Sequence, residues 1–150
     1  MREIFLAPEP MRDRELCLRL LSTSPDQPSS YIHTYHFGMY LDGVPEIVGD
    51  IDLRLGDDSD LLLYSGQVGY GVDPQFRGRH LASRSLQLLL PLARRHGFRE
   101  LWITCDPDNF ASRRSCERLG AVFQGIVAIP ARHEFYALGL RHKCRYRLKL

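Results

Sequence analysis

The stretch that decides the fold spans residues 68–82 and reads Val-Gly-Tyr-Gly-Val-Asp-Pro-Gln-Phe-Arg-Gly-Arg-His-Leu-Ala. Valine and tyrosine alternate with glycine over residues 68–72 and favour a strand. Pro74 ends this strand because proline cannot donate to a β-ladder. A polar loop follows, and an apolar pattern from Leu81 onward predicts a helix. A loop at a helix N-terminus binds anions readily, since its backbone N–H groups lack intrahelical partners.

Two arginines add full positive charge to this loop. Arg77 and Arg79 flank Gly78, and the arginine fork suits phosphate groups. The simpler interpretation is a strand–loop–helix corner with solvated arginines. The spacing excludes a P-loop and a dinucleotide-binding fingerprint, because neither glycine pattern is present.

A second motif follows the predicted helix over residues 79–96 and a short buried strand over residues 100–105. It begins at Asn109 and ends at Gly120. Asn109, or Asp108 before it, can cap a short helix, and Gly120 can take the left-handed position that ends it. We therefore expect a second strand–loop–helix unit at residues 100–120.

The two motifs together resemble the GNAT superfamily of N-acetyltransferases. Residues 77–82 match its pattern Gln/Arg-x-x-Gly-x-Gly/Ala at the first and last positions, with His80 in place of the central glycine. Asn109, Ser112, Leu119 and Gly120 match its later motif. The resemblance covers the chain from about residue 45 to its end.

The resemblance implies an α+β fold. We expect a GNAT-like mixed, mostly antiparallel sheet of six to seven strands flanked by helices, in one domain over residues 1–150. The strand within residues 61–72 is expected to bulge and to splay from the next strand, so that acyl-CoA binds in the gap. The last strand is expected to insert beside the fifth.

The order of elements along the chain follows from periodicity and turn residues. We predict a helix over residues 11–21 and an acidic loop over residues 56–60. The Asp42-Gly43 pair predicts a hairpin turn. Pro91 is expected to kink or shorten the helix over residues 79–96. Strands are predicted over residues 2–7, 31–41, 46–55, 61–72, 100–105, 121–130 and 141–150.

By this resemblance the chain transfers an acetyl group from acetyl-CoA, as co-substrate, to a primary amine by direct attack in a ternary complex. The implied amine belongs to a small molecule or to a peptide or protein N-terminus. The implied cofactor-binding residues are Tyr70, Gly71, Val72, Arg77, Gly78, Arg79, His80, Leu81, Ala82 and Asn109. The implied catalytic residues are Asn109, Ser112 and Cys116. Many family members have a tyrosine at the position of Cys116, so a non-catalytic acyl-CoA-binding module is the alternative function.

The catalytic base and the acceptor site stay open. Candidate bases near the strand ends are His36, Asp50, Asp52, Tyr70 and Asp106. The family builds its acceptor site from segments that carry Tyr31, Tyr35, His36, Tyr40, His133, Glu134 and Tyr136 here.

Composition also bears on the partners and the compartment that we expect. The chain has 150 residues and a formal net charge of +2, which does not indicate a nucleic-acid partner. The strand over residues 141–150 alternates basic and apolar residues, so it has either a solvated face or a basic strip for an acidic partner. Four cysteines lack zinc spacing, so we expect no metal and a reducing, cytoplasmic compartment. There is no membrane-length apolar run or signal-peptide core. A homodimer is an open alternative to a monomer.

Overall fold

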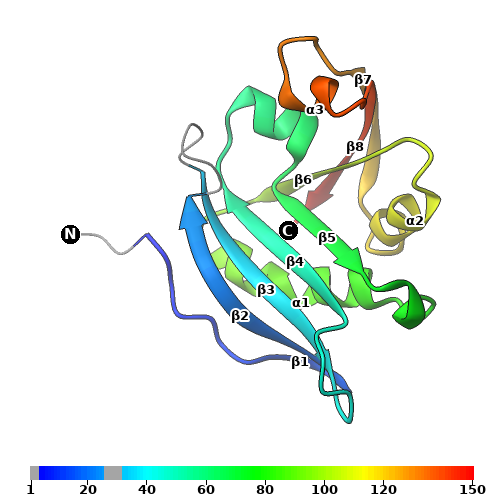
Figure 1. The fold of residues 1–150 in the computed structure, drawn as a ribbon. Helices are drawn as coiled ribbons and strands as arrows, with labels where there is room; N and C mark the ends of the chain where they lie inside the picture. Colours follow the sequence, from blue (N-terminus) through cyan, green and yellow to red (C-terminus); the bar gives the residue numbers. More distant parts are fainter. Residues whose placement is uncertain (1–3, 26–31) are drawn as a thin grey trace.

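The computed structural model describes residues 4–25 and 32–150, in which eight strands form one mixed sheet in the order β1-β2-β3-β4-β5-β6-β8-β7 (Figure 1). Strands β5 and β6 run parallel, and the other neighbouring pairs run antiparallel. The strands are β1 (Met11–Asp13), β2 (Leu16–Pro25), β3 (His33–Leu41), β4 (Gly49–Leu55), β5 (Val68–Val72), β6 (Glu100–Cys105), β7 (Val122–Ala128) and β8 (His142–Lys149). The helices are α1 (Leu81–Arg95), α2 (Phe110–Arg118) and α3 (Glu134–Ala137), with a π-helical turn η1 (Leu61–Ser65) and a 3-10 turn η2 (Pro74–Phe76).

The predicted helix over residues 11–21 is wrong, because this segment forms the β1–β2 hairpin. Arg14 adopts a left-handed φ of 53° in the turn, and Asp13 pairs with Leu16. Leu16 and Leu18 are buried, whereas Cys17 between them is only half-buried. This period of two belongs to a strand, and the clustered leucines concealed it. The hairpin raises the strand number above the six to seven expected.

The predicted strand over residues 2–7 is also wrong for its described part, residues 4–7, which pairs with no strand. The hydroxyl of Tyr35 holds this segment instead. It accepts from the Leu6 backbone N–H at 2.6 Å and donates to the Leu6 carbonyl at 3.3 Å. Arg95 also donates to the Ala7 carbonyl at 3.1 Å, so side chains hold the segment in place of a β-ladder.

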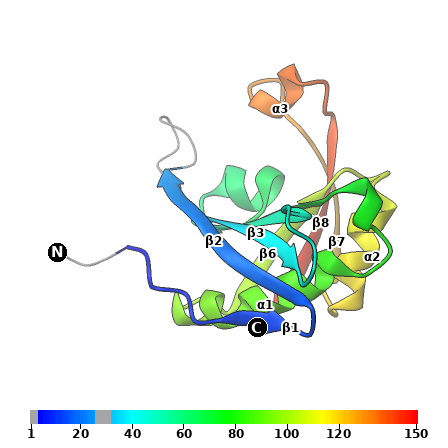
Figure 2. The same ribbon diagram turned by 60° about the horizontal axis from the view of Figure 1, so that its bottom comes forward.

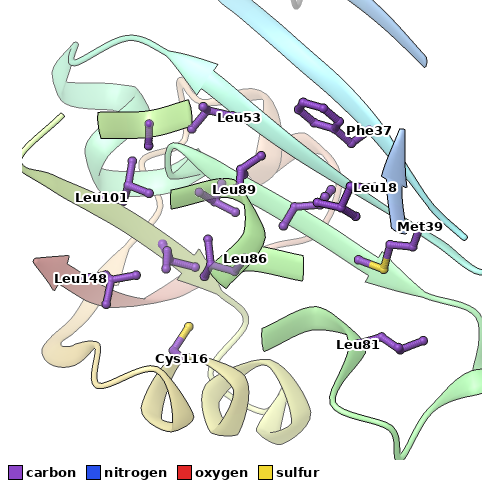
Figure 3. Close-up of a cluster of buried hydrophobic side chains, with 14 of the residues drawn as sticks. Leu18, Phe37, Met39, Leu53, Leu81, Leu86, Leu89, Leu101, Cys116 and Leu148 are labelled. Carbon is purple, nitrogen blue, oxygen red and sulfur yellow. The ribbon is translucent and has the colours of Figure 1, made fainter. Parts of the chain in front are cut away.

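Helix α1 packs on one face of the sheet and forms the main core with it (Figure 3). Leu86, Leu89 and Leu92 from the helix are at most 1% exposed. Pro91 faces solvent, and α1 continues to Arg95, so the proline does not shorten the helix. The buried sheet residues of this core include Leu18, Phe37, Met39, Ile51, Leu53, Leu101 and Leu148.

The opposite face of the sheet, here called the open face, carries polar side chains of β3 and β4. Figure 1 views the sheet from this side, and β2, β3 and β4 are seen with no helix in front of them. In Figure 2, α1 lies on one side of the sheet and α3 projects on the other. The open face carries Thr34, His36 and Tyr40 of β3 and Asp50, Asp52 and Arg54 of β4, which alternate with buried core residues.

The sheet splays between β5 and β6, as the sequence predicted. Strand β5 pairs with β4 at five positions, whereas it pairs with β6 only between Val68 and Ile103. The two strands then diverge, which Figure 1 shows. The predicted bulge in β5 is absent. Strands β4 and β5 are both described over their full length, and the register between them shows no shift. The glycines there accommodate side chains of β4: the Arg54 guanidinium lies against Gly69, and an Asp50 carboxylate oxygen lies against Gly71.

The last strand, β8, inserts between β6 and β7, beside the fifth predicted strand as expected. Its basic residues make contacts within the molecule. Lys143 lies 3.0 Å from Asp106, and Arg145 stacks on Trp102 and donates to the Leu62 carbonyl. In the described part of the chain, no helix has the length and apolar character needed to cross a membrane.

Candidate functional site

A cleft of about 480 Å³ lies along the free side of β5 and brings together most of the predicted cofactor-binding residues. It extends from β5 across the loop before α1 to the first turns of α2. The cleft is lined by Tyr70, Gly71, Val72, Phe76, Arg77, Gly78, His80, Leu81, Ala82, Asn109, Ala111, Ser112, Arg114, Ser115 and Arg118. Of the predicted residues, Arg79 and Cys116 do not line it. The Arg79 guanidinium lies 5.8 Å from the centre of the Phe76 ring.

The loop before α1 depends on two left-handed residues. Gly78 has a φ of 89°, and His80, directly before α1, has a φ of 58° and a ψ of 30°. A side chain in this conformation costs roughly 1–2 kcal/mol, which glycine avoids. This is the physical reason why the family pattern has glycine at the position of His80. His80 is exposed and lines the cleft, so the substitution keeps the backbone path and adds an imidazole.

A second hollow of about 550 Å³ adjoins the cleft, since His80 and Arg118 line both. It is bordered by Arg12, Arg14 and Arg84. Arg84 is held in place by the carboxylates of Asp13 at 2.6 Å and Glu15 at 2.8 Å. The outer end of the cleft is therefore surrounded by arginines, and Arg114 and Arg118 of α2 add to Arg77 of the loop.

The inner end of the cleft holds two hydroxyl groups. The Tyr70 hydroxyl lies 2.8 Å from Ser112 Oγ and 3.6 Å from Cys116 Sγ. The Asn109 side chain accepts from the Ser112 backbone N–H at 3.2 Å and so caps α2, as predicted. Burial raises the pKa of Tyr70, and it raises the pKa of Cys116 to about 12, so both stay protonated at neutral pH. The Cys116 side chain is fully buried.

The five candidate bases separate into three places. Tyr70 lies on the cleft side of β5, and Asp106 forms its ion pair with Lys143 beyond the end of β6. His36, Asp50 and Asp52 lie together on the open face. Burial, and then the neighbouring Asp52 carboxylate, raise the pKa of Asp50.

The family model for the acetyltransferase (GNAT) domain matches residues 5–122, which is most of the chain. The chain belongs to the GNAT acetyltransferase family. The splayed sheet and the loop before α1 are the features by which it resembles the family. No curated protein matches its sequence.

Solved acetyltransferases share the fold of this GNAT acetyltransferase at low identity. RimL, the ribosomal L7/L12 alpha-N-protein acetyltransferase, is 22% identical with a TM-score of 0.57 over 78% of this chain and 61% of its own. The microcin C7 self-immunity acetyltransferase MccE, in complex with acetyl-CoA and AMP, is 17% identical with a TM-score of 0.59 over 78% of this chain and 61% of its own. The chain thus spans about three fifths of these proteins. A third solved structure, described as that of a 'putative acetyltransferase', is 17% identical with a TM-score of 0.68 over 97% of this chain and 89% of its own.

The predicted acceptor residues of the acetyltransferase do not gather in one place. Tyr35 is buried on the α1 side and hydrogen-bonds His96 at 2.6 Å, and His133 is buried at the start of α3. Tyr136 lies under the Arg141 guanidinium, near Glu134 on α3. His36 and Tyr40 share the open face. Tyr31 lies outside the described residues.

Sequence reasoning missed the residues that α2 contributes to the cleft. Ala111, Arg114, Ser115 and Arg118 line it together with Ser112. Residues three and four apart share one face of a helix. Once Asn109 had been identified as the cap, this spacing could have identified that face from the sequence.

Proposed function

We propose that this acetyltransferase transfers an acetyl group from acetyl-CoA to a primary amine by direct attack in a ternary complex. The observation that carries the proposal is the continuity of the cleft. It runs from the arginine-rich loop before α1 to the Tyr70 and Ser112 hydroxyls along the edge of β5 that β6 leaves free. A long ligand with an anionic end and a reactive end fits this arrangement, and acetyl-CoA is such a ligand.

The outer part of the cleft is assigned to the phosphates. Arg77 and the backbone N–H groups at 78–82 bind the pyrophosphate, because arginine and a helix N-terminus both favour anions. Arg118, together with the adjoining hollow, binds the phosphate on the ribose. The free backbone edge at Tyr70, Gly71 and Val72 pairs with the amide groups of the pantetheine arm. His80 remains compatible with this role because it already has the left-handed backbone that the loop requires.

The inner part of the cleft is assigned to the leaving group. The amine nitrogen attacks the thioester carbonyl carbon, a C–N bond forms, and the C–S bond breaks with its electron pair going to sulfur. The hydroxyls of Tyr70 and Ser112 donate hydrogen bonds to the sulfur as its charge develops, which lowers the barrier. Asn109 fixes Ser112 by capping α2, and Cys116 packs beside the Tyr70 hydroxyl.

The proposal is tested by binding and turnover measured on the same protein. Acetyl-CoA is titrated calorimetrically, and release of free thiol is followed in the presence of primary amines and N-terminal peptides. We expect Arg77→Ala to weaken acetyl-CoA binding about tenfold, since hydrogen bonds to charged groups contribute about 1.5–3 kcal/mol. Arg94→Ala, at the far end of α1, is the matched control and should bind normally.

Three outcomes separate the alternatives. Binding with amine-dependent thiol release supports the proposed enzyme. Binding without release for any amine identifies a non-catalytic acyl-CoA-binding module and contradicts the enzymatic assignment. Unchanged affinity in Arg77→Ala contradicts the assignment of the loop to the phosphates.

A further inference from the structure

Three side chains on the open face form a hydrogen-bonded chain, here called the relay. Ser24 Oγ lies 2.7 Å from His36 Nε2, and His36 Nδ1 lies 3.0 Å from Asp52 Oδ1. The His36 and Asp52 side chains are 26% and 24% exposed. Both imidazole nitrogens therefore have a partner, while the relay stays accessible to solvent.

The register of the sheet places the relay in line with the splay between β5 and β6. His36 pairs with Asp52, and Asp52 pairs with Gly69 of β5. Neighbouring strands lie about 4.8 Å apart, so Asp52 is about 5 Å from β5, His36 about 10 Å and Ser24 about 14 Å. Gly69 has no side chain of its own, and the Arg54 guanidinium lies against it on the open face, so Arg54 is the charged group beside Asp52 at this position.

These distances decide which member of the relay can reach the reaction. Ser24 is three strands from β5, so its hydroxyl is too far away to accept an acetyl group from a thioester bound along that strand. Asp52 is the nearest member, and His36 stands behind it. The order Asp52, His36, Ser24 thus leads away from the cleft, as a path for a proton would.

We propose that Asp52 and His36 together remove the proton from the attacking amine, which approaches from the open face. This inference rests on the proposed function. The ammonium form of the amine gives up one proton to the Asp52 carboxylate, and the neutral nitrogen then forms its bond to the carbonyl carbon. The C–S bond breaks, and the second nitrogen proton goes to the departing sulfur. His36 Nδ1–H donates to Asp52 and holds the carboxylate that receives this proton, while Nε2 accepts from the Ser24 hydroxyl. Asp52 is the catalytic residue that touches the amine, and His36 and Ser24 are positioning residues that act through it.

Asp50 provides a matched comparison within the same strand. It lies on the same face of β4, two residues before Asp52, and its carboxylate lies against Gly71 of β5. It is the same residue type as Asp52, yet His36 hydrogen-bonds Asp52. A role that depends on charge alone predicts the same effect at both positions, whereas the relay predicts a large effect at Asp52 alone.

The test compares two acceptor amines at one neutral pH, with acetyl-CoA saturating. Propylamine is protonated under these conditions and must lose a proton to attack, whereas methoxyamine is largely unprotonated. We expect Asp52→Asn and His36→Gln to lower kcat with propylamine about 10²-fold, the lower end of the range for general base catalysis. We expect a much smaller loss with methoxyamine, no change in the Kd of acetyl-CoA, and near-normal kcat in Asp50→Asn.

Each result decides between the relay and its alternatives. An equal loss with both amines would assign the relay a structural role and overturn the proposal. So would unchanged kcat in Asp52→Asn, or an equal loss in Asp50→Asn. Cooperative thermal unfolding of the Asp52→Asn variant will show that it is folded. The ¹⁵N chemical shifts of the His36 imidazole should then differ from those of the wild type, and unchanged shifts would contradict the His36–Asp52 hydrogen bond. If the wild-type protein binds acetyl-CoA but acetylates neither amine, the proposed function itself fails. A loss of turnover confined to the variants would concern the relay alone.

Discussion

The two faces of the central sheet carry different kinds of side chains. On the α1 face, the core is apolar, and the cleft beside it is formed by backbone groups, left-handed loop residues and arginines. On the open face, the cross-strand pairs are polar, and the Ser24–His36–Asp52 relay connects three strands. Strand β5 belongs to both faces, because Tyr70 points toward α2 while Gly69 and Gly71 face the side chains of β4.

This difference indicates that the two sides of β5 serve different substrates. The α1 face holds the features suited to a long anionic donor, and the open face holds the features suited to an acceptor that must lose a proton. In this account the thioester lies where β5 and β6 separate and can be reached from both sides. Substitutions on the two faces should therefore affect different quantities.

The largest expected effect on stability lies on the α1 face. Leu89→Ala removes a fully buried side chain between α1 and the sheet and should lower the free energy of unfolding by about 2–5 kcal/mol. Asp52→Asn on the open face should lower it by less than about 1.5 kcal/mol, since it weakens one partly exposed hydrogen bond. Urea unfolding of both variants measures the contrast. Similar losses would mean that the open face also supports the fold.

Within the cleft, the largest expected effect on turnover that leaves binding intact is at Tyr70. Tyr70→Phe removes the hydroxyl beside Ser112 and should lower kcat about 10²-fold, comparable to the loss of one oxyanion-hole donor. The Kd of acetyl-CoA should not change. Tyr64→Phe in η1 is the matched control, because Tyr64 does not line the cleft and lies outside the proposed acceptor side. If Tyr70→Phe turned over normally, the leaving-group assignment would fail.

A smaller effect should separate the two ends of the cleft. Arg118→Ala should weaken acetyl-CoA binding by about tenfold or less, the range of a charge-assisted hydrogen bond at an exposed site. It should leave the affinity for acetyl-pantetheine, which lacks the nucleotide, unchanged. Calorimetric titration with both ligands tests this. Equal weakening for both ligands would place Arg118 at the reactive end instead.

The smallest expected effect concerns the loop itself. His80→Gly relieves a left-handed side chain, which saves roughly 1–2 kcal/mol, while glycine's greater freedom in the unfolded chain costs roughly 0.5–1 kcal/mol. We expect the free energy of unfolding to rise by up to about 1 kcal/mol. Thermal unfolding compared with His80→Ala, which keeps the strain, measures it. A destabilised glycine variant would show that the imidazole stabilises the loop.

The elements around the cleft could be predicted from sequence because their signals are local. The turn after Val72, the strand over residues 100–105 and the cap at Asn109 each depend on residues a few positions apart. The β1–β2 hairpin was missed because its turn contains Arg14, which rarely adopts a left-handed conformation. No glycine or asparagine marked the position, so the leucines suggested a helix.

The relay could not be predicted, although His36 and Asp52 were each recognised as candidate bases. Its geometry depends on the register of β2, β3 and β4, and the β2–β3 register shifts between Leu20 and Ser22. That shift decides which β2 side chains share a face with His36. A one-residue change in register moves every side chain to the other face.

The proposed enzyme depends first on binding of acetyl-CoA in the cleft beside β5. Calorimetric titration of the wild-type chain with acetyl-CoA tests it most directly, with Arg77→Ala as the paired variant. We expect one site per chain with micromolar affinity, weakened about tenfold in the variant. An absence of heat in the wild type at millimolar ligand, or equal affinity in both proteins, would contradict it.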